Sequence, residues 1–295
     1  MPRLPEYPDT CYKLQIEGFP GIYGHLVETT VRLISWDENN WKISHHDKIV
    51  RLLGDSFETR RKAIDQTIAA EKEKGTFRVL KRSTGERFPI FGPNRELIVD
   101  LDRAASTLFG IVTYGVQLIV YRQEADGLSF WLARRSKNKT LYPDRLGVTV
   151  GGSLPSMETP FECLVRESHE EAGLTADLIK NHAKAAGNIS YVTMSDTQTT
   201  SGGEAGLIRA EIQYIYHLKA GPEVVPKPYD MEASDISLYS IEETKRALDA
   251  GEFTPANACL ILDFFIRHGL VTYENEENYN QIIARLHRPL GIQTA

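Results

Sequence analysis

Residues 151–174, GGSLPSMETPFECLVRESHEEAGL, constrain the fold more than any other segment because they contain signals for both ends of a helix. Thr159 is placed to cap the amino terminus, with Pro160 at the first helical position and Glu162 at the third position of a capping box. Gly173 supplies the stop signal. The segment therefore predicts a helix between Pro160 and Gly173.

The predicted helix carries three glutamates on neighbouring turns. Residues three and four apart share one helix face, so Glu167 lies beside both Glu170 and Glu171. Like charges at this spacing cost about 0.2–0.5 kcal/mol per pair, and Arg166 alone is too little to offset them. A divalent cation would offset them, because hard ions such as Mg²⁺ prefer carboxylate oxygens. The alternative interpretation is an ordinary solvated charged face.

Composition narrows the class of protein. A chain of 295 residues with 41% hydrophobic and 25% charged residues is typical of one large or two ordinary globular domains. The net charge of −6 argues against a general nucleic-acid binder, and no apolar run approaches the roughly 20 residues of a membrane span. The start of the chain lacks a signal-peptide core, and three separated cysteines form neither a disulfide framework nor a zinc pattern. We predict a cytoplasmic protein without nucleic-acid or membrane partners, either a monomer or a homodimer.

The pattern of elements divides the chain into two parts. An amphipathic helix at 57–74 and short strands at 77–82 and 87–92 predict an N-terminal α/β extension over residues 1–98. Residues 99–295 interleave helices with β-branched and aromatic runs but show no regular βαβ alternation. We therefore expect an α+β sandwich with a mixed sheet. Its strands are predicted at 110–123, 128–136, 146–152, 186–195, 209–220 and 236–240, and its C-terminal helices at 241–251, 257–269 and 277–288.

The spacing within the glutamate-rich segment resembles that of the Nudix hydrolase family, G-x5-E-x7-R-E-U-x-E-E-x-G-U, where U is a bulky apolar residue. This chain places Gly152, Glu158, Arg166, Glu167, Glu170, Glu171, Gly173 and Leu174 at the corresponding positions. Ser168 departs from the pattern at the first U position. The resemblance implies a Nudix-type α/β/α sandwich and a hydrolase that cleaves diphosphate linkages.

The resemblance also implies a set of site residues. Mg²⁺, with Mn²⁺ as the alternative, would be held by Glu167, Glu170 and Glu171 and by the Gly151 carbonyl. Arg166 would pair with Glu158, while Gly152 and Gly173 would be structural. Such ions neutralise the charge of a diphosphate and make bound water more acidic.

Three residues outside the segment are further candidates. Family members often add an acidic residue from a later loop, and Glu232 is expected to act as a ligand or general base. Arg135 and Lys139 are expected to bind the substrate phosphates. The plainer alternatives are a surface glutamate and exposed basic residues on a hairpin.

Residues 99–290 look like the Nudix branch found with, or beside, thiamine pyrophosphokinase in fungi and plants. That likeness makes thiamine diphosphate or its analogues the leading substrate class. Gly147 and Val148 stand where the branch carries Asp-Asn, so a prenyl diphosphate or a nucleoside diphosphate derivative is the alternative. A third hypothesis is that the chain is a non-catalytic Nudix module that binds a ligand.

Overall fold

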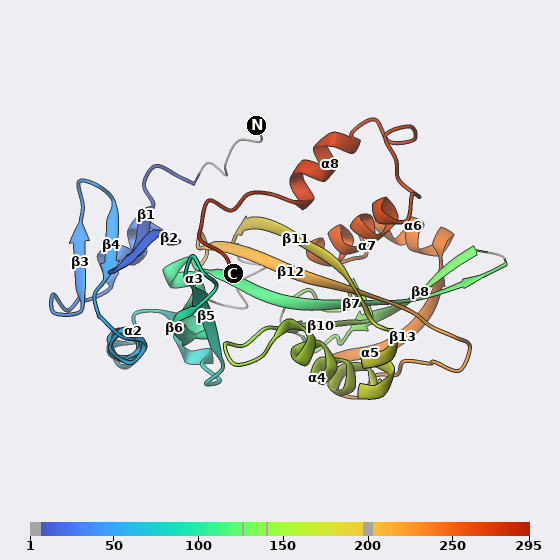
Figure 1. Cartoon of the computed structure of the whole chain (residues 1–295), viewed down its shortest axis with the longest axis horizontal. Helices are drawn as coiled ribbons and strands as arrows, with labels where there is room; N and C mark the ends of the chain where they lie inside the picture. The colour runs from blue at the N-terminus through green and yellow to red at the C-terminus, as the bar shows by residue number, and fades with distance from the viewer. Residues whose placement is uncertain (1–6, 126, 140, 197–202) are drawn as a thin grey trace.

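The computed structural model describes residues 7–125, 127–139, 141–196 and 203–295. Figure 1 shows a small N-terminal unit beside a larger layered unit built around one long, curved sheet. The N-terminal unit contains β1 (Tyr12–Ile16), β2 (Phe19–Leu26), α1 (Glu28–Leu33), β3 (Trp41–Ser44), β4 (Ile49–Leu52), α2 (Phe57–Lys74), η1 (Arg78–Arg82), β5 (Arg87–Phe91), β6 (Leu97–Asp102), η2 (Arg103–Ala105) and α3 (Ser106–Phe109).

Two sheets and one long helix organise the N-terminal unit. The first sheet has the order β2-β1-β4-β3, and the second is the antiparallel pair β5-β6. Helix α2 begins after Ser56 in a capping box and ends at Gly75, which adopts a left-handed conformation with φ of 67°. Glycine reaches this conformation without a Cβ clash, so the helix ends where the sequence predicts.

The strand predicted at 77–82 is wrong, because this segment forms the 3₁₀ helix η1. Phe77 and Leu80 are buried, whereas Arg78, Lys81 and Arg82 are exposed. Buried positions three apart match the three-residue turn of a 3₁₀ helix and not the two-residue period of a strand.

The core of the N-terminal unit extends further along the chain than expected. The division predicted at residue 98 falls inside β6, and one hydrophobic cluster continues from Tyr12 to Ile111. We propose that the boundary between the two units lies after Ile111, where the next cluster begins at Val112.

The larger unit contains a mixed sheet with the order β11-β12-β7-β8-β13. Strands β12 and β7 are parallel, whereas the other pairs are antiparallel, and β10 and β9 join the sides of β7 and β8. The strands are β7 (Val112–Glu124), β8 (Gly127–Arg135), β9 (Leu146–Gly147), β10 (Val150–Ser153), β11 (Lys184–Met194), β12 (Ile208–Lys219) and β13 (Ala233–Ser240).

Helices cover both faces of this sheet (Figure 1). One face packs against α4 (Pro160–Ala172) and α5 (Ala176–His182), and the other against α6 (Ile241–Asp249), α7 (Pro255–Arg267) and α8 (Tyr279–Leu286). Along β7, Leu118 and Val120 belong to the first core layer and Ile119 to the second, as the two-residue period of a strand requires. The expected α+β sandwich with a mixed sheet and C-terminal helices is therefore confirmed.

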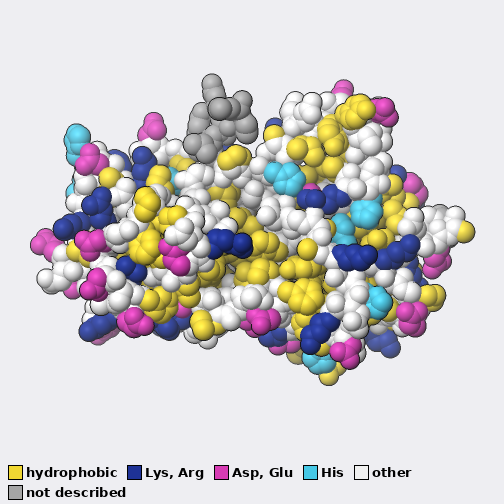
Figure 2. Space-filling model, in the orientation of Figure 1, with side chains coloured by type: hydrophobic (Ala, Val, Ile, Leu, Met, Phe, Trp, Pro, Cys, Tyr) yellow, Lys and Arg dark blue, Asp and Glu magenta, His cyan; other side chains and the backbone are white. Residues whose placement is uncertain are grey.

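The surface carries both signs of charge. On the face drawn in Figure 2, acidic and basic side chains of the described residues are interspersed and form no continuous basic stripe. No helix in the described part of the chain is both long and apolar enough to cross a membrane. The absence of nucleic-acid and membrane partners nevertheless stays a prediction.

Ser168, the departure from the family pattern, lies on the inner face of α4. Its side chain is fully buried, and its Oγ has no hydrogen-bond partner among the described residues. The neighbouring turns of α4 supply Leu164 and Ala172 to the same apolar layer. A buried hydroxyl without a partner costs about 1–3 kcal/mol of stability.

We therefore expect Ser168→Val to raise the free energy of unfolding by about 1 kcal/mol and to leave activity nearly intact. Ser168→Ala removes the hydroxyl without adding volume, so it separates the polar effect from the packing effect. Urea titrations and activity assays on both variants would measure this. A large loss of activity in a normally folded variant would show instead that Ser168 touches substrate or metal.

Candidate active site

Helix α4 has the two ends that the sequence predicts. The Thr159 side chain accepts a hydrogen bond from the Glu162 backbone N–H, and Glu162 Oε2 accepts one from the Thr159 N–H at 2.9 Å. At the other end Gly173 has φ of 62°. These local interactions fix where α4 starts, and therefore which of its residues face the cleft.

Arg166 and Glu158 form a two-pronged ion pair. Arg166 Nε and Nη2 donate to the two carboxylate oxygens of Glu158, each at 2.8 Å. This geometry is the strongest form of arginine–carboxylate pairing, and the hydrogen bonds from Arg166 lower the pKa of Glu158. The pair ties the loop before α4 to the middle of the helix, as the resemblance implied.

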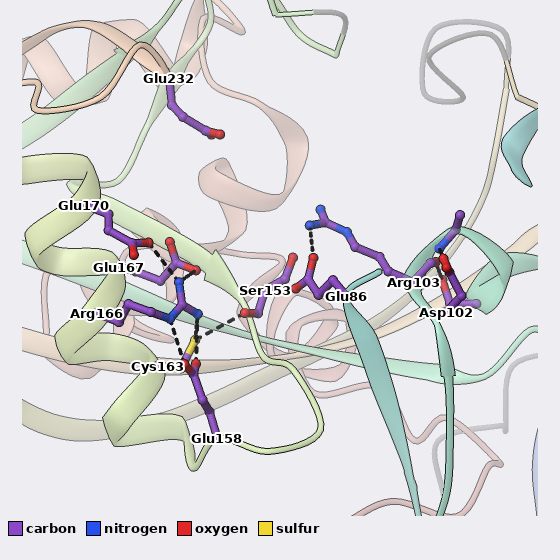
Figure 3. Close-up of polar contacts among 12 residues, drawn as sticks. Glu86, Asp102, Arg103, Ser153, Glu158, Cys163, Arg166, Glu167, Glu170 and Glu232 are labelled. Atoms are coloured by element: carbon purple, nitrogen blue, oxygen red, sulfur yellow. Dashed lines mark hydrogen bonds and ion pairs between the residues drawn. The ribbon is translucent and has the colours of Figure 1, made fainter. Parts of the chain in front are cut away.

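The remaining Arg166 nitrogen also contacts carboxylates. Nη1 donates to Glu167 Oε1 at 2.8 Å and to Glu170 Oε2 at 2.9 Å (Figure 3). Arg166 thus offsets more of the glutamate repulsion than the sequence suggested. Its guanidinium is fully occupied by Glu158, Glu167 and Glu170, together with a long contact to Cys163 Sγ.

Two of the glutamates of α4 carry raised pKa values. Burial raises the pKa of Glu167, and only 14% of its side chain is exposed. Burial raises the pKa of Glu171 to about 8, against a hydrogen bond from the Gly151 N–H that favours the charged form. Glu167, Glu232 and Asp230 add repulsion at Glu171. Ionised Glu167 and Glu171 are therefore costly here unless a cation joins them.

A glycine, Gly152, allows the backbone of β10 to approach these carboxylates. A Cβ on Gly152 would lie 2.2 Å from Glu167 Cγ and Cδ, so no larger residue fits without moving Glu167. The adjacent Gly151 N–H donates to Glu171 Oε2 at 2.9 Å. Strand β10 thus packs against the acidic face of α4, and Gly152 has a steric reason for being glycine.

The acidic face of α4 opens into a cleft of about 390 Å³, which we call the carboxylate cleft. Among the described residues, the charged side chains lining it are five glutamates and two arginines: Glu86, Glu158, Glu167, Glu171, Glu232, Arg103 and Arg166. No three His, Cys, Asp or Glu side chains of the described chain form a ready-made metal site. Glu170 lies beside the cleft, half exposed and turned to Arg166.

The three candidates outside the segment lie near this cleft. Glu232 reaches toward it from a different part of the chain than α4 (Figure 3), and its Oε1 pairs with Lys139 Nζ at 2.6 Å. The predicted phosphate ligand and the predicted base are therefore bonded to each other. The Arg135 guanidinium donates to the Leu141 carbonyl at 3.1 and 3.2 Å and lines two neighbouring clefts.

A larger cleft of about 660 Å³ adjoins the first, between the sheet and the N-terminal unit; we call it the interunit cleft. A polar network crosses its floor. Glu211 accepts hydrogen bonds from Tyr191 Oη at 2.6 Å, Arg209 Nη2 at 2.9 Å and Gln213 Nε2 at 3.2 Å, and Gln117 Nε2 donates to Gln213 Oε1 at 3.0 Å.

Sequence reasoning missed this network and the pair Glu86–Arg103. The network did leave a signal, because Gln117 interrupts the apolar run 116–120, and Glu211 and Gln213 are one strand period apart. Glu86 and Arg103 left none, because only tertiary packing brings the N-terminal unit to the cleft.

Comparison with known proteins agrees with this geometry. The NUDIX domain family model matches residues 113–259. An uncharacterized protein of Saccharomyces cerevisiae is 33% identical over 261 residues, which cover 87% of this chain and 76% of that protein. Nudix hydrolase 20, chloroplastic, of Arabidopsis thaliana is 29% identical over 230 residues, covering 78% of this chain and 58% of its own length. Nudix hydrolase 24, chloroplastic, of the same plant is 28% identical over 228 residues, covering 77% and 59%.

The chain thus spans less than two thirds of the length of the two Arabidopsis relatives. The matched region includes the whole glutamate-rich segment and the strands that support it. Because the family match, the named relatives and the layered fold around α4 agree, residues 113–259 of the chain form a NUDIX domain.

Proposed function

We propose that this protein hydrolyses the diphosphate linkage of a small molecule, X-diphosphate, to X-monophosphate with the help of Mg²⁺. The observation that carries the proposal is the carboxylate cleft, in which burial raises the pKa of Glu167 and Glu171 within a motif that retains every family carboxylate. Such a cleft is electrostatically unfavourable by itself, and a divalent cation with a phosphate substrate would complete it.

The residues present fit a hard cation. The Glu167, Glu170 and Glu171 carboxylates would hold it, with the Gly151 carbonyl as a further oxygen ligand. A bound Mg²⁺ would neutralise phosphate charge and acidify water. Glu167 and Glu170 now contact Arg166 Nη1, so in this proposal they exchange that contact for the cation, while Glu158 retains Arg166.

The chain's own groups would carry the remaining steps. Water attacks one phosphorus, the bond from that phosphorus to the bridging oxygen breaks, the other phosphate group leaves with the bridging oxygen, and the water proton passes to a base. Glu232 is our proposed base, because it faces the carboxylate cleft from outside α4. Arg135 would hold the diphosphate from the adjoining clefts.

The interunit cleft supports a polar X over a prenyl group. Glu211 is 13% exposed and forms the centre of its polar floor, and covering this carboxylate with a hydrocarbon chain would remove its remaining water. Val148, which stands at one of the two positions where the branch carries Asp-Asn, lines the adjoining cleft beside Arg135 but is only 4% exposed and packs mainly in the core layer beneath α7. We therefore propose thiamine diphosphate or its analogues as the leading substrate class, with nucleoside diphosphate derivatives next.

We expect Mg²⁺-dependent phosphate release from thiamine-type diphosphates, less from nucleoside diphosphate derivatives and least from prenyl diphosphates. One assay of the purified protein with all three classes, with and without EDTA, would measure this order. Turnover of none of them would overturn the proposed function. A preference for prenyl diphosphates would overturn the proposal that the group X contacts the polar floor of the interunit cleft.

We expect Glu171→Gln and Glu170→Gln each to reduce kcat by about 100-fold or more, equivalent to ~2.7 kcal/mol of barrier. The metal-free melting temperature should stay at or above the wild-type value, because each change removes a repelled carboxylate. The rise in melting temperature on adding Mg²⁺ should be lost, because ligands stabilise only the form that binds them.

Glu73→Gln is the matched control, since Glu73 is an exposed helical glutamate of α2 outside the carboxylate cleft. It should leave kcat and the Mg²⁺ effect unchanged. Wild-type turnover in both Glu170 and Glu171 variants would remove the basis for a metal site on α4.

We expect Arg135→Ala to raise KM by about tenfold, equivalent to ~1.4 kcal/mol, with a smaller change in kcat. Its guanidinium contacts only a backbone carbonyl among the described residues, so it remains able to bind phosphate. Lys139→Ala should raise KM less, because Lys139 already pairs with Glu232. Steady-state kinetics would rank the KM values of the two variants. An equal or reversed order would contradict the inference that Arg135 is freer than Lys139 to bind phosphate.

A further inference from the structure

Arg103 belongs to the N-terminal unit but lies at the proposed active site. It follows β6 directly, in η2, and it lines both the carboxylate cleft and the interunit cleft. Among the described residues of the N-terminal unit, it is the only one that lines both. Arg103 therefore lies where the two clefts join.

Three contacts orient the Arg103 side chain. Its Nη1 donates to Glu86 Oε2 at 2.6 Å, and its backbone N–H donates to the Glu86 carbonyl at 2.9 Å. Its Cζ lies 5.7 Å from the centre of the Phe88 ring. Figure 3 shows the Glu86–Arg103 pair on the opposite side of Ser153 from Arg166 and its glutamates. The guanidinium is thus held across the cleft from α4.

The N-terminal unit is also attached to the loop that leads into α4. The Ser156 N–H donates to the Arg87 carbonyl at 2.9 Å, and Ser156 Oγ donates to Asp100 Oδ2 at 3.0 Å. Asp100 is 2% exposed and pairs with Arg87 Nε at 2.5 Å. These contacts hold hairpin β5-β6 against residues 154–158, so the position of Arg103 relative to α4 is fixed by packing.

The two arginines of the carboxylate cleft differ in how many carboxylate partners they already have. Five glutamates and two arginines line the cleft among the described residues. Arg166 already pairs with two of these glutamates, Glu158 and Glu167, and with Glu170 beside the cleft. With the described part of the chain, Arg103 forms one side-chain hydrogen bond, from Nη1, and 52% of its side chain is exposed. Its remaining N–H groups can bind two oxygens of a phosphate in the paired geometry that guanidinium favours.

We propose that Arg103 binds a phosphate of the diphosphate substrate, so that the N-terminal unit completes the active site of the Nudix domain. This inference rests on the proposed function for the identity of the substrate. Glu86 and Phe88 are positioning residues, which hold the Arg103 guanidinium toward the cleft.

The test uses Arg103→Gln and Arg103→Lys in the full chain, with Lys81→Gln as the control. Lys81 is an exposed cation of η1 in the same unit and lines neither cleft. The probe is methylenediphosphonate, a diphosphate analogue that cannot be hydrolysed, titrated calorimetrically with saturating Mg²⁺. We expect its Kd to rise at least tenfold in Arg103→Gln, to recover partly in Arg103→Lys, and to stay at the wild-type value in Lys81→Gln.

A double variant, Glu86→Gln/Arg103→Gln, removes the unpaired Glu86 charge that Arg103→Gln leaves behind. If its Kd also stays at least tenfold above wild type, the lost guanidinium and not the exposed carboxylate weakens binding. Recovery of wild-type affinity in the double variant, or an unchanged Kd in Arg103→Gln, would overturn the proposal.

Failure of the proposed function gives a different result. If wild type hydrolyses no diphosphate but binds methylenediphosphonate through Arg103, the hydrolase proposal fails and the phosphate site stands. If wild type hydrolyses a diphosphate and Arg103→Gln leaves both KM and the Kd unchanged, the function stands and Arg103 has no part in it. Absence of any diphosphonate binding by wild type would overturn the Arg103 site.

Discussion

The concentration of carboxylates in one partly buried cleft is the constraint on which the rest of the site depends. Burial raises the pKa of Glu167 and Glu171, so their ionised forms are costly in the cleft. Several features reduce this cost: Arg166 contacts three glutamates, and the Gly151 N–H supports Glu171. These contacts are local to α4 and β10. Among the described residues they leave five glutamates against two arginines in the carboxylate cleft, and the proposed metal site rests on this imbalance.

The two structural units meet at this cleft, which gives the N-terminal unit a place in the proposed chemistry. Ser156, in the loop before α4, bonds to both strands of the β5-β6 hairpin. The same hairpin leads into Arg103. Since the interunit cleft has walls from both units, the group X would contact residues that lie more than 100 positions apart in the chain, such as Phe88 and Gln213.

Much of the fold was predictable because its signals are local. The ends of α4 follow from Thr159, Glu162 and Gly173, whose side chains or backbone satisfy groups within one turn. The mixed sandwich follows from the order of strands and helices. The strand predicted at 77–82 is wrong because its buried residues, Phe77 and Leu80, lie three positions apart, which matches a 3₁₀ turn and not a strand. We propose a boundary after Ile111 and not at residue 98, because β6 belongs to the N-terminal core.

The sequence by itself determined the family motif, the helix that carries it and the alignment of Glu167, Glu170 and Glu171, because a helix converts spacing directly into position. Only the tertiary structure decided which groups face them. It joined Lys139 to Glu232, buried Val148 in the core and brought Arg103 to the cleft. Contacts between distant segments depend on how whole layers pack. The residue type at one position therefore does not identify the neighbours that distant segments bring to it.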